Sequence, residues 1–350
     1  MKMDAQIKFE LPIWNGIQEK PGVSATKLEI NYSDLTGIYI QMGKRIIQYE
    51  KNYKHMTPLG GSNYIENLRK GKIDWILNRI SKCDKVLEIG GGDSSNYKHF
   101  DCEKYTIIDP SIKQNEKTSK LTLITDYFEN VTLNEKYDLV LLISVLEHVD
   151  DPHLIIEKAY NVLKDDGSMY VFIPIIDKQF AIGDFNALIH EHMSYFTYIG
   201  AKNLFKRNNL LIDNYFFKND GGFFKLIKGE SELDKNENYD LENISYTFNY
   251  QYNKFRDLVS NGERILFYGA TNGLNNLFYL AGEDIDYEKY RITDSDEIKW
   301  NKYISSHPLP IIPINHIEDY KTVCISALSF YDQIAKSLPK DKIVISTASI

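Results

Sequence analysis

The chain contains the run Val86-Leu87-Glu88-Ile89-Gly90-Gly91-Gly92-Asp93-Ser94, in which an apolar segment with an acidic residue near its end passes directly into three glycines. Glycine has no Cβ atom, so such a turn can bend sharply and its backbone can come close to a ligand. Doubly wound folds hold nucleotides at a glycine turn of this kind after a parallel strand. The run therefore predicts a strand that ends in a ligand-binding turn.

Three further predicted strands follow the glycine turn, and they end at Asp109, Asp126 and Ser144. The carboxylate of Asp109 is suited to bind the two hydroxyls of a ribose. The run Leu146-Glu147-His148 comes shortly after the last of these strands. Strands that alternate with helices in this way predict a parallel sheet covered on both faces.

Residues 70–174 resemble the class I S-adenosylmethionine-dependent methyltransferases through the glycine turn, the strand ends and the Leu146-Glu147-His148 run. The resemblance implies S-adenosylmethionine as cofactor and S-adenosylhomocysteine as product. It also implies a close approach of the cofactor to the glycine turn, ribose binding by Asp109 and an adenine near Asp126. The cofactor-binding residues expected on this basis are Glu88, Gly90, Gly92, Asp109, Asp126, Tyr127, Ser144 and Leu146.

Two other interpretations of the glycine turn stay open. An NAD-type Rossmann domain has three spaced glycines, the third of which packs the helix, whereas Ser94 and Ser95 follow the cluster here. The turn is also compatible with a core position that meets no ligand. The agreement of four strand ends favours S-adenosylmethionine.

Composition excludes several classes of partner. The 350 residues suffice for two or three domains, and a net charge of -8 without a basic block argues against nucleic acid. Cys83, Cys102 and Cys324 are scattered and form neither a disulfide framework nor a zinc motif, which fits a reducing cytoplasm. The first residues lack a secretion signal, and no apolar run could span a membrane. We expect a cytoplasmic protein without a membrane partner, and the sequence predicts no oligomeric state.

A second strand-glycine unit begins after a polar stretch, at residues 264–273, and a later strand ends at Asp294. The predicted fold is α/β: a class I methyltransferase Rossmann-like sheet, a smaller Rossmann-like C-terminal domain and a small N-terminal region. The expected boundaries are 1–62, 63–240 and 241–350. The amides at the helix start after this turn are suited to bind a diphosphate, and the glycines are equally compatible with a tight turn alone. The substrate-binding residues expected here are Gly269, Asn272 and Gly273.

The run His190-Glu191-His192 follows the fifth predicted strand. It is a poor metal motif, because residues two apart diverge on a helix and zinc proteases space their histidines four apart. No cysteine lies nearby, and we therefore predict no metal site. A solvated loop with chance histidines is one interpretation. The other is a general base with an orienting carboxylate, since histidine titrates near neutral pH.

The run from Ile189 to Phe196 resembles the signature of the sugar C-methyltransferase family, which methylates nucleotide-linked 4-keto-deoxysugars at C3. The C-terminal runs 268–273, 293–296 and 307–312 are also similar, so the likeness extends from about Tyr49 to the C-terminus. Family members have a zinc-binding N-terminal domain, a class I central domain and a Rossmann-like C-terminal domain.

This chain departs from the family in three places. The N-terminal zinc cysteines are absent, so no zinc is carried over. Ile189 stands where the family has a tyrosine before the His-Glu-His run. The tyrosine-rich N-terminal loop is matched only loosely by residues 49–58, in which Tyr53 is the best counterpart of an active-site tyrosine.

The resemblance implies that His192 removes a proton next to a ketone, so that the enolate carbon attacks the methyl group of the cofactor. Glu191 is expected to orient His192 or its substrate, Tyr53 to supply a hydroxyl, and His190 to be the less favoured base. The same base could act on a sugar hydroxyl. We therefore keep two alternatives: an O-methyltransferase for a sugar or other small metabolite, and a non-catalytic cofactor-binding or scaffold protein.

Overall fold

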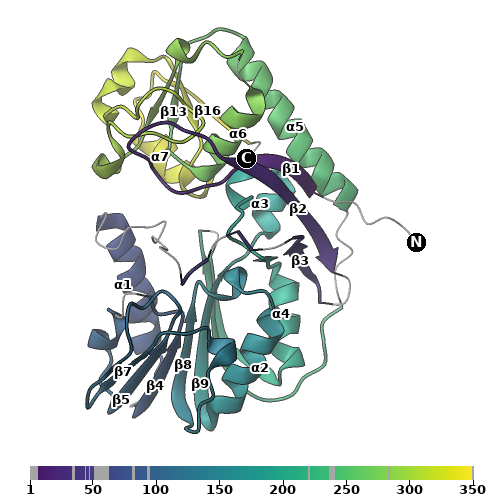
Figure 1. Cartoon of the computed structure of the whole chain (residues 1–350). Coiled ribbons are helices and arrows are strands. Elements are labelled where there is room, and N and C mark those ends of the chain that lie inside the picture. Colours follow the sequence, from purple (N-terminus) through teal and green to yellow (C-terminus); the bar gives the residue numbers. More distant parts are fainter. Residues whose placement is uncertain are drawn as a thin grey trace. The chain divides into compact units, whose positions relative to one another are not determined.

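The larger of the two Rossmann-like sheets has eight strands in the order β11-β12-β9-β8-β4-β5-β7-β6 (Figure 1). Strands β9, β8, β4, β5 and β7 run parallel, whereas β12 is antiparallel to β9 and to β11. The strands are β4 (Lys85–Ile89), β5 (Lys104–Ile108), β6 (Glu116–Lys117), β7 (Leu121–Ile124), β8 (Tyr137–Ile143), β9 (Leu163–Pro174), β11 (Leu210–Lys218) and β12 (Gly221–Lys228).

This computed structural model describes residues 7–33, 36–43, 45–46, 48–50, 63–80, 83–92, 95–219, 221–235, 241–282 and 284–348. Tyr53, the predicted source of a catalytic hydroxyl, lies outside the described residues. Within these ranges, every helix is too short or too polar to cross a membrane.

Helices cover both faces of the large sheet, because alternate residues of each strand point to opposite sides. Helix α1 (Asn63–Leu77) lies on one side of the sheet, and α2 (Pro152–Val162) and α4 (Tyr198–Arg207) lie on the other (Figure 1). Val86 and Leu139 pack with α1, whereas Leu87 and Val140 pack with α2 and α4. Parallel strands buried in this way are almost entirely apolar. The predicted α/β class with a covered parallel sheet is confirmed.

The order of the strands creates a switch point between β4 and β8. The chain adds β5 and β7 on one side of β4 and then returns to add β8 and β9 on the other side. In open α/β sheets, ligands bind beyond the carboxyl ends of the strands at such a point. Gly90 follows β4 and Ser144 follows β8, so two of the residues expected to bind the cofactor lie at this edge of the sheet.

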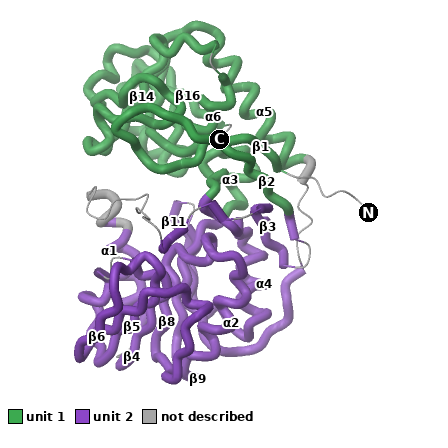
Figure 2. Tube along the Cα trace, in the orientation of Figure 1, with its two compact units in different colours: residues 1–31, 176–190, 239–350 green, residues 32–175, 191–238 purple. Residues whose placement is uncertain are grey.

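The chain divides into two compact units (Figure 2). Unit 1 comprises residues 1–31, 176–190 and 239–350, and unit 2 comprises residues 32–175 and 191–238. Each unit is thus assembled from separated stretches, whereas the sequence suggested the consecutive ranges 1–62, 63–240 and 241–350. Those ranges stay a prediction of how the chain folds into domains.

Unit 1 contains the second Rossmann-like sheet, in which four strands run parallel in the order β14-β13-β15-β16. These strands are β13 (Ile265–Tyr268), β14 (Tyr290–Thr293), β15 (Thr322–Ile325) and β16 (Ile343–Ser346). The helices of this unit are α3 (Asp177–Ile182), α5 (Leu241–Ser260), α6 (Asn272–Ala281) and α7 (Tyr331–Ser337). This sheet is separate from the large one, as the second strand-glycine run predicts.

Short antiparallel strands complete both units. In unit 1, β1 (Ile7–Pro12) pairs with β2 (Ala25–Ser33), with Ile7 opposite Ile30. In unit 2, β3 (Ile38–Gln41) pairs with β10 (Ser194–Tyr195), and the Gln41 amide donates to the Met193 carbonyl at 2.9 Å. The strand β10 begins two residues after His192, so this pairing fixes the segment that carries the candidate base.

Candidate functional site

The glycine turn after β4 is shaped by its own packing. Gly90 has φ +71° and Gly92 has φ +52°, values that favour glycine. A Cβ atom on Gly90 would lie 2.5 Å from Cγ2 of Val145, the second residue after β8. A glycine is therefore required at position 90, next to the switch point between β4 and β8. The contact of the Gly90 backbone with a cofactor stays a prediction.

Asp109 ties the glycine turn to the end of β5. Its Oδ2 accepts from the Gly92 amide at 2.9 Å, and its Oδ1 accepts from the amide and the hydroxyl of Ser111 at 2.7 and 2.6 Å. A carboxylate has about four acceptor sites, so these three bonds leave one for a ribose hydroxyl. The residue thus orders the turn and keeps capacity for a ligand.

Glu88 lies in a buried network on the α1 side of the sheet rather than at its edge. Its carboxylate accepts from Asn96 at 2.6 Å and from the Tyr105 hydroxyl at 2.8 Å, and Arg69 donates to Asn96 at 3.0 Å. Burial and the neighbouring carboxylate hold the pKa of Tyr105 well above its usual value. Sequence analysis missed Asn96 and Tyr105; the alternation of side chains along β4, which puts Glu88 on the face of Val86, is the signal that could have found them.

Asp126 and Tyr127 lie beyond the end of β7. Oδ1 of Asp126 accepts from the Tyr127 amide and from Asn130 at 2.7 and 2.8 Å. The Tyr127 hydroxyl donates to Glu50, and the Arg45 guanidinium lies 5.7 Å from the centre of the Tyr127 ring. Burial, reinforced by Glu50, raises the pKa of Tyr127 to about 12, so this hydroxyl stays protonated.

After β8, Ser144 is exposed and Leu146 is buried. Ser144 is exposed and has φ +57°, a strained value for a residue with a side chain, and its amide donates to the Phe172 carbonyl at 2.8 Å. Such strain clusters at functional sites. The side chain of Leu146 is fully buried in the core between the sheet and α2, so only its backbone is available to a ligand.

The residues at this edge of the sheet fit an adenosyl group. Asp109 keeps one acceptor site for a ribose hydroxyl, and Ser144 is exposed at the end of β8.

Glu191 and His192 contact the residues that follow β8. The Met193 amide donates to the Glu147 carbonyl at 2.7 Å, which joins the two segments. The rings of His148 and His192 lie 5.0 Å apart, and Nδ1 of His148 lies 3.2 Å from the Glu191 carbonyl oxygen. The candidate base therefore lies beside the run that the sequence singled out for its likeness to methyltransferases.

Burial sets the protonation of this cluster. It holds the pKa of His192 well below its usual value, and the neighbouring His148 lowers that pKa further. Burial also raises the pKa of the Glu147 carboxyl. His192 is consequently neutral at neutral pH, the form in which an imidazole nitrogen can accept a proton.

Tyr49 contacts the candidate catalytic cluster from the described part of the N-terminal region. Its hydroxyl donates to Oε1 of Glu191 at 3.3 Å, and its ring lies 6.2 Å from that of His148. Sequence analysis missed this residue as a functional candidate, although it begins the tyrosine-rich segment that was matched to the family loop.

His190 belongs to unit 1, whereas Glu191 and His192 belong to unit 2. His190 is buried, and its Nε2 lies 3.2 Å from the Thr26 carbonyl oxygen. Burial lowers its pKa. The contact with the Thr26 carbonyl gives His190 a structural role, and its place as the less favoured base stays a prediction.

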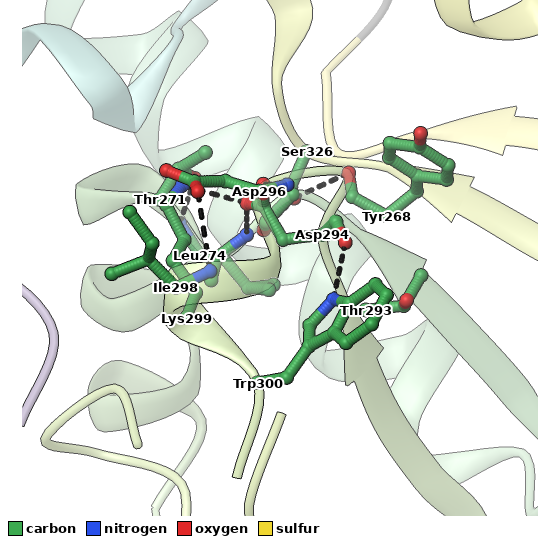
Figure 3. Close-up of polar contacts among 12 residues, drawn as sticks. Tyr268, Thr271, Leu274, Thr293, Asp294, Asp296, Ile298, Lys299, Trp300 and Ser326 are labelled. Carbon is green, nitrogen blue, oxygen red and sulfur yellow. Dashed lines mark hydrogen bonds and ion pairs between the residues drawn. The ribbon is translucent and has the colours of Figure 1, made fainter. Parts of the chain in front are cut away.

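The second glycine turn in unit 1 is closed by its own side chains (Figure 3). Gly269 has φ +112°, and the buried Ser326 hydroxyl donates to its carbonyl at 2.6 Å. Oδ2 of Asp294 accepts from the Ala270 amide at 2.9 Å and from Nζ of Lys299 at 2.7 Å (Figure 3 shows Asp294, Lys299 and Ser326 around this turn).

The first amides of α6 also have protein partners. The Gly273 amide donates to Oδ1 of Asn186 at 2.8 Å, and the Leu274 amide donates to the Thr271 hydroxyl at 3.2 Å. Asn272 is buried and donates to the Leu188 carbonyl at 2.8 Å. The predicted contact of Gly269, Asn272 and Gly273 with a diphosphate is untested, and it would require Asn186 to move.

Residues 64–214 match the family described as "Methyltransferase domain". The stretch contains the strands of the large sheet from β4 to β9 and the first part of β11, with the glycine turn, Asp109 and the His192 segment. The stretch is therefore similar to a methyltransferase domain, and it has the class I Rossmann-like fold, for which S-adenosylmethionine is the methyl donor.

Individual relatives cover less of the chain. The ubiquinone biosynthesis O-methyltransferase of Glaesserella parasuis serovar 5 (strain SH0165) is 44% identical over 41 residues, which are 12% of this chain and 17% of that protein. The N-methyltransferase NodS from Bradyrhizobium japonicum is 14% identical, with a TM-score of 0.38 over 48% of this chain and 99% of that one. A putative S-adenosylmethionine-dependent methyltransferase from Listeria monocytogenes is 12% identical, with a TM-score of 0.38 over 46% of this chain and 100% of that one.

Proposed function

We propose that the protein is an S-adenosylmethionine-dependent methyltransferase that C-methylates a nucleotide-linked keto-deoxysugar. One observation carries the proposal: His192, a neutral and largely enclosed imidazole, lies beside His148, which follows β8 at the switch point of the methyltransferase sheet. A proton acceptor and the expected cofactor edge thus belong to one unit.

In the proposed reaction, His192 accepts the proton from the carbon next to the ketone of the sugar. S-adenosylmethionine, held through Asp109 and the backbone of the glycine turn, supplies the methyl group. Glu191 supports the arrangement through its neighbours, since it accepts from Tyr49 and its carbonyl oxygen contacts His148. A base in this position typically contributes ~100- to 10,000-fold to the rate.

The proposal is tested by incubating the protein with S-adenosylmethionine and a panel of nucleotide-linked keto-deoxysugars. We expect a product heavier by one methylene group, with the new methyl group on the carbon next to the ketone in the NMR spectrum. We also expect that the hydrogen on this carbon exchanges with deuterated solvent without cofactor, and that the exchange depends on His192.

O-methylation is the second candidate, because the 41-residue match is to an enzyme named as an O-methyltransferase. The same imidazole would then accept a hydroxyl proton. A methyl group on oxygen in the NMR spectrum, together with no solvent exchange at carbon, would select this alternative. Failure of S-adenosylmethionine to bind at all would leave the scaffold interpretation.

A further inference from the structure

We propose that Glu147, His148 and His192 form a binding site for a first-row divalent cation of the Zn²⁺ type. The proposal goes beyond methyl transfer and does not depend on the identity of the substrate. It also differs from the sequence prediction of no metal site, which rested on the spacing of the His190-Glu191-His192 run and on the absence of a cysteine motif.

The three side chains already lie within reach of one ion. One ligand atom from each lies within 4.8 Å of the other two, and Nε2 of His148 is 3.8 Å from Oε1 of Glu147. Two ligands of a tetrahedral Zn²⁺ lie about 3.4 Å apart, given bonds of about 2.1 Å. Side-chain rotations of roughly 1 to 1.5 Å at the ligand atoms would therefore close the site.

The backbone presents His148 in the tautomer that a metal requires. Nδ1 lies 3.2 Å from the Glu191 carbonyl oxygen, and as the donor to that oxygen it leaves the lone pair of Nε2 on the side of Glu147. Metal-binding histidines almost always donate their other ring N–H to a carbonyl or carboxylate. The bond from the Met193 amide to the Glu147 carbonyl holds the two ligand segments together.

The carboxylate of Glu147 provides the independent evidence for a missing partner. The residue is 2% exposed, and its Oε2 has no hydrogen-bond partner among the described residues. Lys72 interacts with this carboxylate through its charge but does not donate to Oε2. Buried polar atoms are normally satisfied, because an unpaired one has lost its hydrogen bonds to water without gaining others. A bound cation would satisfy this oxygen.

The ligand set selects the type of ion. Two imidazole nitrogens and one carboxylate suit Zn²⁺, Fe²⁺, Co²⁺ or Ni²⁺, whereas Mg²⁺ and Ca²⁺ prefer oxygen ligands alone. Three protein ligands leave a coordination position for water or substrate. A nitrogen lone pair binds either a metal or a proton. An ion on His192 would therefore block its use as a base, so that occupancy of the site and proton removal exclude each other.

The test is a titration of the full-length protein, stripped of metal with a chelator, with Zn²⁺ by calorimetry and with Co²⁺ by visible absorption. We expect one ion per chain and the intense visible bands of Co²⁺ with fewer than six ligands. Glu147→Gln and His148→Gln should each weaken binding at least tenfold. His190→Gln is the matched control, because His190 bonds to the Thr26 carbonyl in unit 1 and should not affect affinity.

Absence of stoichiometric binding by the wild-type protein would overturn the proposal, and so would equal losses in His190→Gln and Glu147→Gln. Circular dichroism shows whether each variant is folded, and the Co²⁺ spectrum of the wild type gives an answer even if one variant fails to fold. S-adenosylmethionine binding is measured separately on the metal-free protein. Its failure would contradict the proposed function and leave the metal proposal standing.

Discussion

The glycine turns of unit 2 and unit 1 have the same hydrogen-bond pattern but different surroundings. In both, the first glycine amide donates to the end of the neighbouring strand: Gly90 to the Ile108 carbonyl at 2.9 Å and Gly269 to the Thr293 carbonyl at 2.8 Å. In both, a carboxylate at that strand end accepts from an amide of the turn and from the amide two residues later; these carboxylates are Asp109 and Asp294.

The difference lies in what fills the strand ends. In unit 1, Lys299 pairs with Asp294, Ser326 is buried against the turn, and Asn186 occupies the Gly273 amide. In unit 2, Ser144 is exposed at the end of β8, and Asp109 is absent from the ion pairs of the described residues. A glycine turn followed by an acidic residue at the next strand end therefore indicates a Rossmann-like fold. A ligand-binding site is indicated only where exposed polar groups around the turn have no protein partner.

The largest effect that would distinguish the units concerns the base. We expect His192→Ala to lose ~100- to 10,000-fold in turnover while it keeps its affinity for S-adenosylmethionine. His190→Ala, in unit 1, should lose much less. Steady-state rates with the active keto-sugar and calorimetry with the cofactor measure both quantities, and wild-type turnover by His192→Ala would refute the assignment of the base.

The two carboxylates provide a matched pair for cofactor binding. Asp109→Asn should weaken S-adenosylmethionine binding by tenfold or more, because bonds to a charged group contribute about 1.5 to 3 kcal/mol. Asp294→Asn should leave the affinity unchanged and lower only the stability of its unit. Calorimetric titration decides the matter: equal losses in the two variants would mean that unit 1 also takes part in cofactor binding.

Two glycines in helices differ in the space that an added Cβ atom would find. An added Cβ on Gly273 would lie 2.6 Å from Asn186, so Gly273→Ala should destabilise the protein by about 1 to 3 kcal/mol. Gly71, inside α1, has open space at that position, and Gly71→Ala should stabilise by about 0.5 to 1 kcal/mol. Thermal unfolding curves shifted in the same direction would show that the closed turn in unit 1 is not tightly packed.

The smallest expected effect concerns Lys299, whose ammonium group pairs with Asp294 in unit 1. Lys299→Met removes the partner of Asp294 at a partly exposed position, and we expect a loss of about 1 kcal/mol or less. Denaturant unfolding with the Asp294→Asn and double variants measures the coupling between the two residues. Additive losses would mean that the lysine does not close the turn.

The sequence predicted the strands and the acids at their ends because both follow from local patterns. The apolar runs of β4, β5 and β8 and the punctuation by Gly90 and Asp109 are visible without any tertiary information. The buried position of Glu88 was also accessible, because it shares a face with Val86 and therefore points toward α1.

The candidate catalytic cluster was not predictable in the same way. Glu147 and His148 follow β8, whereas His192 precedes β10, and no spacing rule relates residues brought together by β9, α3 and the return of the chain. The same reason hid Tyr49 and explains why a metal site was not expected from the His190-Glu191-His192 run. Only the described fold brings Glu147, His148 and His192 into one cluster.

The bond between Tyr49 and Glu191 has a consequence for the order in which the chain folds. The two residues are 142 positions apart, whereas His148 and Glu191 are 43 apart. Closing the longer loop in the unfolded chain costs about 1 kcal/mol more entropy, and a single hydrogen bond contributes only about 1 kcal/mol in return. We therefore expect the tyrosine contact to form after the sheet has brought His148 and Glu191 together, so that the segment with Tyr49 joins the candidate site late in folding.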